Sequence, residues 1–260
     1  MASKLILLTL IIYAISYGSI IIKTDNSMWD NYLHDIINIR YSRAPNSVYF
    51  NGNNISEYYE NITTTYYKID GDYLQIFPIE TKSQNTIELY YSSGISSLKS
   101  MFDFCPDFIK SISFSNFDMS ATTDMDYMFE NCNSLEYIYG LNPVNVINMY
   151  NTFRDCTSLK YIGFKNYASY NQIKFMKNLF YNCQSLTSID LSNFFTNKVE
   201  SMENMFYNCK NLNAITFGSG FSASSVTFMS YMFYNCQNLK SLDLHYLKDS
   251  QNVVFMDYMF

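Results

Sequence analysis

The sequence is poor in the residues on which most catalytic and metal-binding sites depend. It has only two histidines, His34 and His245, which lie far apart, and only eight glycines. No cysteine pair has metal-ligand spacing, and no phosphate-binding glycine loop or nucleophile motif occurs. We therefore expect no catalytic residues, no cofactor and no metal site, and a protein that is not an enzyme.

Charge is also scarce. Charged residues make up 15% of the 260 residues, and the formal net charge is −6. Nucleic acids and anionic membrane surfaces are bound through clustered Lys and Arg, and no basic cluster interrupts this acidic balance. We expect no nucleic acid partner, and contact with a membrane only through an uncleaved N-terminal anchor.

Long apolar runs are absent except at the N-terminus. Residues 5–22 follow Lys4 and carry no charge. With small residues such as Ser16 and Gly18 spaced for cleavage, this run predicts a signal peptide over residues 1–18. The alternatives are an uncleaved anchor, since the run just reaches spanning length, and a buried core helix. The first cysteine is Cys105, which excludes a lipid-modified cysteine directly after the leader.

The abundant feature is a repeat with the pattern V-x2-M-x2-M-F-x2-C-x2-L-x2-I-x-F. Its copies occupy residues 87–260, and successive motif phenylalanines are 27, 24, 27, 26, 27 and 27 residues apart. The motif phenylalanines are Phe102, Phe129, Phe153, Phe180, Phe206, Phe233 and Phe260. A fixed period of this length predicts stacked coils, in which each copy covers the apolar face of the next.

The two halves of each copy predict different local structures. In the first half, apolar residues recur every three to four positions, as in Val199, Met202 and Phe206, which predicts a short helix or a helical turn. The second half alternates, which predicts a strand. We therefore predict an α/β solenoid whose coils of about 24–27 residues form a parallel β-sheet.

The repeat resembles a known family. Met176–Phe194 reads MKNLFYNCQSLTSIDLSNF, and Phe114–Ser120 reads FSNFDMS. Both resemble the BspA-like leucine-rich repeat of surface proteins of anaerobic bacteria, mycoplasmas and several protists. The resemblance covers about residues 87–260, and it implies a leucine-rich-repeat fold and a secreted or cell-surface protein of the adhesion and recognition type. It implies no chemistry.

Residues 19–86 lie outside the repeats. Ser27 is a candidate helix cap, and short strand-like runs occur at Val48–Phe50, Thr64–Ile69 and Tyr73–Phe77. We expect this segment to cap the open apolar edge of the first coil. A separate functional domain is the alternative, although no motif supports one.

Two further features concern modification and the chain end. Asn54 and Asn61 stand in N-glycosylation sequons, which carry meaning only in a secreted eukaryotic protein. The last copy stops at Phe260, before its cysteine and strand. We interpret this as a fragment first, with a truncated product or end-to-end self-association as alternatives.

The six cysteines occupy one repeat position, three residues after a motif phenylalanine. They are Cys105, Cys132, Cys156, Cys183, Cys209 and Cys236. We expect a ladder of small, buried, unpaired thiols, because cysteine packs as a small apolar residue. Neighbouring coils are close enough for disulfides to be the alternative.

The outward positions of the predicted strands are candidate binding residues. Stacking aligns them into a strip, with Tyr137, Tyr139 and Tyr161 forming an aromatic patch. The strip comprises Glu136, Tyr137, Tyr139, Lys160, Tyr161, Thr187, Asp190, Thr216, Lys240 and Asp243. The alternative for any single residue is a solvated polar position without a partner.

These observations leave three hypotheses for function. The first is a recognition module that binds a protein or glycan at a cell surface or in a matrix. The second is a self-associating wall, coat or matrix component. The third, an intracellular scaffold, requires that residues 1–22 not direct export.

Overall fold

The computed structural model describes residues 95–260, except 106, 108, 166–168 and 248, together with six strands nearer the N-terminus. The six are β1 (Ser19–Asp25), β2 (Ile39–Tyr41), β3 (Ser47–Phe50), β4 (Asn53–Asn54), β5 (Asp72–Leu74) and β6 (Gln84–Tyr90). The predicted signal peptide, the predicted helix after Ser27, the predicted strand Thr64–Ile69 and Asn61 lie outside the described residues.

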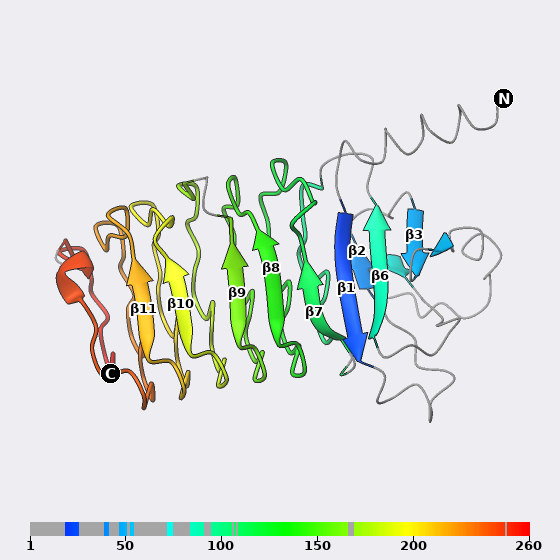
Figure 1. Ribbon diagram of the computed structural model, residues 1–260. Coiled ribbons are helices and arrows are strands. Elements are labelled where there is room, and N and C mark those ends of the chain that lie inside the picture. Colours follow the sequence, from blue (N-terminus) through cyan, green and yellow to red (C-terminus); the bar gives the residue numbers. More distant parts are fainter. Residues whose placement is uncertain are drawn as a thin grey trace.

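The repeats contribute parallel strands that lie side by side (Figure 1). They are β7 (Ile109–Ser113), β8 (Tyr137–Leu141), β9 (Tyr161–Phe164), β10 (Ser188–Leu191) and β11 (Ala214–Phe217). β7, β8 and β9 pair in parallel within one sheet, and β10 pairs in parallel with β11. In β10, Ile189 and Leu191 are buried while their neighbours are exposed, as period-2 alternation requires. The predicted parallel strand half of the repeat is confirmed.

The strands before the repeats continue the same sheet. β1 pairs antiparallel with β7 on one side and with β6 on the other, and the sheet order is β4-β3-β6-β1-β7-β8-β9. β3 matches the predicted strand at 48–50, and β6 runs across the predicted boundary at residue 87. The backbone of β1 thus hydrogen-bonds to the N–H and C=O groups along the free edge of β7, the first repeat strand. This edge is where we expect a cap to lie.

The first half of each repeat is not helical, so this part of the α/β prediction is wrong. Within the described residues the one helix is η1, a 3-10 helix over Leu244–Leu247. Residues 203–208 form tight turns instead, and Asn204 and Asn208 have φ of 56° and 59°. An α-helix does not accommodate left-handed residues four apart. The apolar spacing of three to four residues therefore comes from successive turns.

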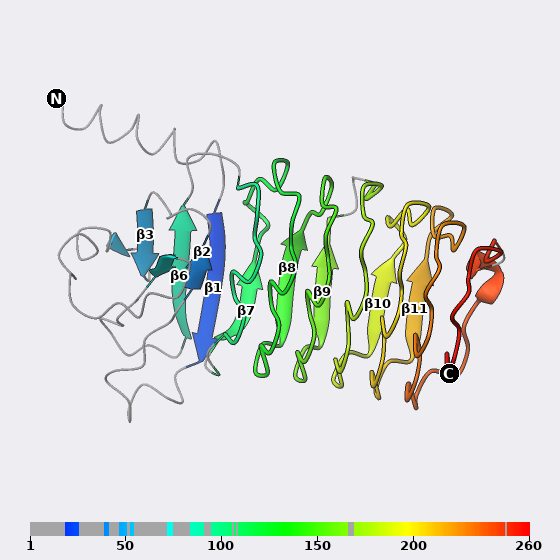
Figure 2. The same ribbon diagram turned by 180° about the vertical axis from the view of Figure 1, so that it is seen from behind.

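Backbone hydrogen bonds between repeats explain why turns replace the helix. The N–H of Tyr207 donates to the carbonyl of Asn204 at 3.1 Å, which closes a turn within the repeat. The N–H groups of Asn204 and Phe206 donate to the carbonyls of Ser230 and Met232 in the next repeat, at 3.0 and 2.8 Å. A helix would consume these donors internally. Alternate N–H donors thus bond each coil to its neighbour. These turns, residues 203–208 and their equivalents in the other repeats, form the side of the molecule away from the strands, here called the turn side (Figure 2).

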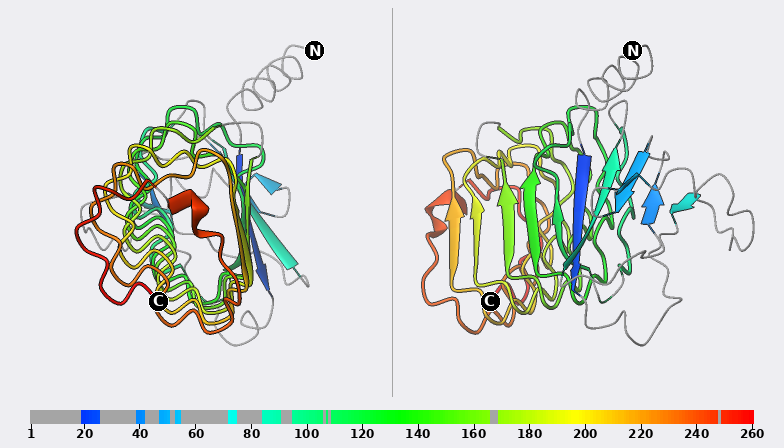
Figure 3. Two further views of the ribbon diagram at one scale, coloured as in Figure 1. Left: turned by 90° about the vertical axis from the view of Figure 1, so that its left-hand side faces the viewer. Right: turned by 45° about the vertical axis from the view of Figure 1, so that its right-hand side comes forward.

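The core is a column of stacked phenylalanine rings. Seen end-on, the coils superpose with the strands along one side (Figure 3). The motif phenylalanines from Phe102 to Phe260 stack ring on ring, with centroids 5.3–5.6 Å apart and interplanar angles of 4–15°. Those from Phe102 to Phe233 are fully buried. Because the repeat places the same ring at the same position, each ring fills the space beside its neighbour.

The cysteines form a second internal ladder beside the rings. All six thiols are free, and five are buried. From Cys132 onward, each Sγ donates to the backbone carbonyl of the motif phenylalanine one repeat earlier, at 2.9–3.1 Å. The structure therefore matches the unpaired ladder rather than the bridged alternative.

The thiol ladder is expected to be chemically inert in the folded protein. Burial raises the pKa of Cys132, Cys156, Cys183 and Cys209 well above 9.0, and raises the pKa of Cys236 to about 11. At pH 8 about one Cys236 in a thousand is then a thiolate, the reactive form. We expect these five cysteines to resist 5,5′-dithiobis(2-nitrobenzoate), whereas all six react after denaturation. Rapid labelling of more than one thiol in the folded protein, or disulfides detected by intact mass, would contradict the packing.

Candidate functional site

The sheet face carries a cluster of three tyrosines, Tyr137 and Tyr139 on β8 and Tyr161 on β9, here called the tyrosine triad. In the parallel register Tyr137 lies opposite Tyr161. The rings of Tyr137 and Tyr139 are parallel within 7° at 6.2 Å, and those of Tyr139 and Tyr161 are 5.6 Å apart. Tyr139 is 40% exposed and Tyr161 is 49% exposed. The predicted aromatic patch is therefore a contiguous surface that solvent reaches.

Gly163 determines where the Tyr161 ring lies. A Cβ placed on Gly163 would come within 3.0 Å of the Cε1 and hydroxyl oxygen of Tyr161. This separation is tighter than most side-chain contacts, so a side chain at residue 163 would require the Tyr161 ring to shift by a few tenths of an ångström. Glycine here therefore lets Tyr161 extend along the strand.

The charges beside the triad are paired with each other. Lys160 Nζ donates to Glu136 Oε2 at 2.6 Å and lies 5.9 Å from the ring centroid of Tyr137. The bond to Glu136 raises the pKa of Lys160, and partial burial raises the pKa of Tyr139, with Tyr137 and Tyr161 contributing. Lys160 is therefore charged at neutral pH, the Tyr139 hydroxyl is neutral, and the patch has no net charge.

A second group of predicted strip residues lies on β10 and β11 or directly before β10. Thr187, Asp190 and Thr216 are exposed, and Asp190 lies opposite Thr216 in the parallel pair. Asp190 Oδ1 accepts the N–H of Ser192 at 2.8 Å, which closes the turn after β10. This part of the strip presents small polar groups and one carboxylate, without an aromatic ring.

The last two predicted strip residues do not lie on a strand, and the prediction of a strand position is wrong for them. Lys240 and Asp243 are exposed and precede η1. Asp243 accepts the N–H of His245 at 3.0 Å and contacts its Nδ1 at 2.8 Å, which lowers the pKa of Asp243. This local bond favours the start of a helical turn over an extended strand.

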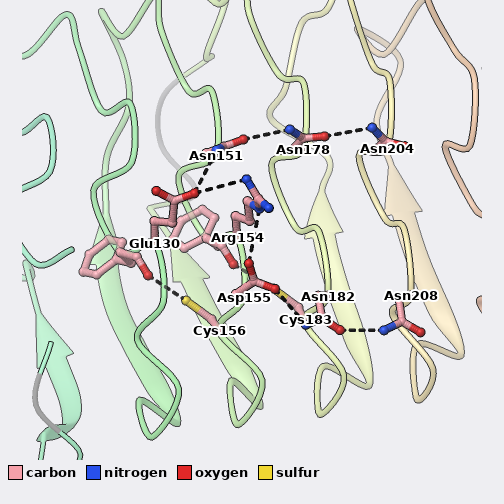
Figure 4. A network of polar contacts seen from close by, with 12 residues as sticks. Glu130, Asn151, Arg154, Asp155, Cys156, Asn178, Asn182, Cys183, Asn204 and Asn208 are labelled. Carbon is pink, nitrogen blue, oxygen red and sulfur yellow. Dashed lines mark hydrogen bonds and ion pairs between the residues drawn. The ribbon is translucent and has the colours of Figure 1, made fainter. Parts of the chain in front are cut away.

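Sequence reasoning missed a polar ladder on the turn side. Asn204 Nδ2 donates to Asn178 Oδ1 at 3.0 Å, and Asn178 Nδ2 donates to Asn151 Oδ1 at 2.8 Å. Asn151 Nδ2 then donates to Glu130 Oε1 at 2.9 Å. The donors all point toward the N-terminal repeats, so the chain of amides ends on a carboxylate (Figure 4).

A second ladder runs parallel to the first. Its amides, Asn235, Asn208 and Asn182, donate in turn toward Asp155 at 2.6, 2.5 and 2.7 Å. Arg154 lies between the two ends, with Nη1 3.5 Å from Glu130 Oε1 and Nε 3.2 Å from Asp155 Oδ2 (Figure 4). Burial raises the pKa of Glu130, which Arg154 partly offsets. One arginine thus bridges the two carboxylates that terminate the ladders.

A sequence signal for these ladders was present. An asparagine stands two residues before or after most motif phenylalanines, as Asn178 and Asn182 flank Phe180. Both have φ near +60°, a conformation that asparagine tolerates better than most residues. The pattern indicates paired left-handed turns and, through stacking, an amide ladder.

The turn side also carries tyrosines that the strip prediction did not include. Tyr181, Tyr207 and Tyr234 stack in sequence with centroids 4.7 and 5.1 Å apart. The guanidinium of Arg154 lies 5.2 Å from the ring centroid of Tyr181. Because these rings face each other, they present mainly their edges to solvent.

Among the described residues we find no helix with the length and apolar character needed to cross a membrane.

Comparison with known proteins tests the predicted family. The family model for the BspA type leucine rich repeat region, with six copies, matches residues 56–167 and 122–258. No curated protein matches the chain. The crystal structure of a leucine-rich repeat protein from Eubacterium ventriosum ATCC 27560 is similar over 65% of this chain and 43% of that one, at 20% identity and a TM-score of 0.38. The family model covers more than half of the chain, so the chain belongs to the BspA-type leucine-rich-repeat family.

Proposed function

We propose that this protein is a non-catalytic recognition module, secreted or displayed at a cell surface, that binds a protein or glycan through its sheet face. In this proposal residues 1–18 act as a signal peptide and the repeats form one solenoid. The observation that carries it is the exposed tyrosine triad on a backbone-bonded parallel sheet. Tyrosine is enriched at interfaces because one side chain offers both an apolar ring and a hydroxyl.

The rigidity of the sheet face supports recognition. Backbone hydrogen bonds join β7 to β9 in one sheet and β10 to β11 in another, and inward residues such as Ile138 and Ile189 are buried in the phenylalanine core. Side chains on such a surface need little ordering when a ligand binds, which lowers the entropic cost of association. Membership of a family whose members are often surface-associated agrees with display outside the cell.

The proposal is tested by binding to an immobilised panel of extracellular matrix proteins and cell-surface glycans. A strip variant, Thr187→Arg with Thr216→Arg, adds bulk and charge at two exposed positions of the face. The matched control, Asn116→Arg with Asn197→Arg, makes the same change in exposed loops. We expect the strip variant to weaken binding at least about tenfold, and the control to change it less than about twofold.

Two results would contradict the proposal. Equal loss of binding in both variants would show that the ligand does not recognise the sheet face. Absence of any ligand, combined with concentration-dependent polymers of the whole protein, would favour the self-associating wall or matrix component instead.

A further inference from the structure

We infer that the tyrosine triad binds a linear, neutral chain of hexopyranose units. This inference rests on the proposed function, since it names the ligand class of the same face. It is carried by three observations, which are the ring geometry, the local charge balance and the polar surroundings of the triad.

The ring geometry suits a sugar chain. Three tyrosines lie within one patch, with neighbouring centroids 6.2 and 5.6 Å apart, a spacing similar to the length of one pyranose unit. Tyr139 and Tyr161 are the two exposed rings of the triad and are tilted by 42° rather than stacked face to face, so they offer ring surface to the apolar C–H side of a pyranose. Tyrosine hydroxyls at the rim donate and accept hydrogen bonds, as sugar hydroxyls require.

The charge balance argues for a neutral ligand. Lys160 and Glu136 form a 2.6 Å pair at the edge of the triad, so neither offers an uncompensated charge to a partner. A surface that recognises polyanions or polycations gains affinity and rate from unpaired charges of one sign. The paired side chains still hold further hydrogen-bonding capacity for hydroxyl groups, since a carboxylate has a second oxygen and an ammonium group three donors.

The surroundings argue against a protein partner at the triad. The neighbouring residues are small or charged and polar: Ser111 and Ser113 on β7, Thr187 directly before β10 and Asp190 on β10. A standard protein interface buries about 800 Å² on each side around a large apolar centre. On β7 to β11, where the structure describes the side chains, the large exposed apolar surface is instead confined to the triad, which matches a narrow chain.

The inference is tested by calorimetric titration of the full chain with three neutral hexasaccharides, cellohexaose, maltohexaose and hexa-N-acetylchitohexaose, and with a heparin-derived hexasaccharide as the polyanionic comparison. We expect at least one neutral hexasaccharide to bind, and the polyanion to bind more weakly. Tyr161→Ala is expected to reduce that affinity roughly tenfold, as loss of a central interface tyrosine does. Tyr207→Ala, on the turn side, is the matched control and should leave the affinity unchanged.

A second variant separates ring position from ring removal. Gly163→Ala keeps all three tyrosines but adds a Cβ 3.0 Å from the Tyr161 ring, so the ring must shift by a few tenths of an ångström and binding should weaken, by less than in Tyr161→Ala. Each variant is compared with the wild type by thermal unfolding to show that it folds.

The outcomes distinguish this inference from the proposed function. If no neutral hexasaccharide binds while a protein ligand still recognises the strip, the saccharide inference is overturned and the recognition role stands. Saccharide binding that survives Tyr161→Ala and Gly163→Ala, or that is weaker than heparin binding, also overturns the inference. If the strip binds neither class, both fail.

Discussion

Replacing Phe180 with alanine is expected to destabilise the repeats by about 3–5 kcal/mol, the range for truncating a buried aromatic side chain. Phe180 is fully buried and stacks with Phe153 at 5.3 Å and with Phe206 at 5.3 Å. The substitution leaves a cavity and interrupts the ring column near its middle. Because each repeat contacts only its neighbours, the interruption should also uncouple the two halves. Urea unfolding followed by circular dichroism should then show a lower midpoint and a broader or divided transition.

A control within the same repeat separates burial from the loss of a phenyl ring. Phe175 is 41% exposed on the turn side. Phe175→Ala should therefore cost less than about 1 kcal/mol, as expected for a partly exposed position. Equal destabilisation by the two substitutions would show that the ring column does not couple the repeats.

Replacing Asn178 with aspartate is expected to cost about 3–5 kcal/mol at neutral pH, the range for leaving a buried charge unpaired. Asn178 is 7% exposed, donates to Asn151 Oδ1 and accepts from Asn204 Nδ2. Aspartate has nearly the same shape and tolerates the left-handed φ of 58° at this position, so the backbone is undisturbed. It removes the donor toward Asn151 and sets a carboxylate against that carbonyl oxygen. The expected loss of unfolding free energy therefore measures how much the hydrogen bonds of the polar ladder at residue 178 stabilise the protein.

The same variant has a predicted pH dependence. Burial raises the pKa of a carboxyl at residue 178 in the folded state above its unfolded value of about 3.9. The folded state then binds the proton more tightly, so the unfolding free energy falls as pH rises through this window and recovers as pH falls. The difference in unfolding free energy between Asn178→Asp and the wild type should therefore narrow as the pH is lowered from about 7 to about 4, because the protonated acid again donates to Asn151. Urea midpoints measured across this range test it.

The matched control for the ladder is Asn197→Asp at an exposed position. It adds the same charge without interrupting the ladder, so it should change stability by less than about 0.5 kcal/mol. The difference in unfolding free energy between Asn178→Asp and the wild type could instead stay constant with pH. That result would indicate that the lost stability does not come from a buried carboxylate.

Sequence reasoning succeeded where stacking repeats one residue at one place. The strand half follows from alternation such as Ile189 and Leu191, and the phenylalanine and cysteine columns follow from the period alone. The contact of Tyr161 with the two tyrosines of β8 also follows, since parallel strands in register bring equivalent positions together. It failed in the first half of the repeat, where apolar spacing does not distinguish a helix from paired turns.

What the sequence determines by itself is the repeat. A fixed period of apolar residues obliges neighbouring copies to cover one another, whatever local structure each copy adopts. The tertiary structure decided the rest. Donors such as Asn204 N–H bond to the next coil instead of their own, which selects turns over a helix. Asparagine amides align into ladders only when coils stack in that register, and Asp243 starts η1 because its nearest donor is local. These choices depend on which partner satisfies each polar group, and that partner is known only once the chain is folded.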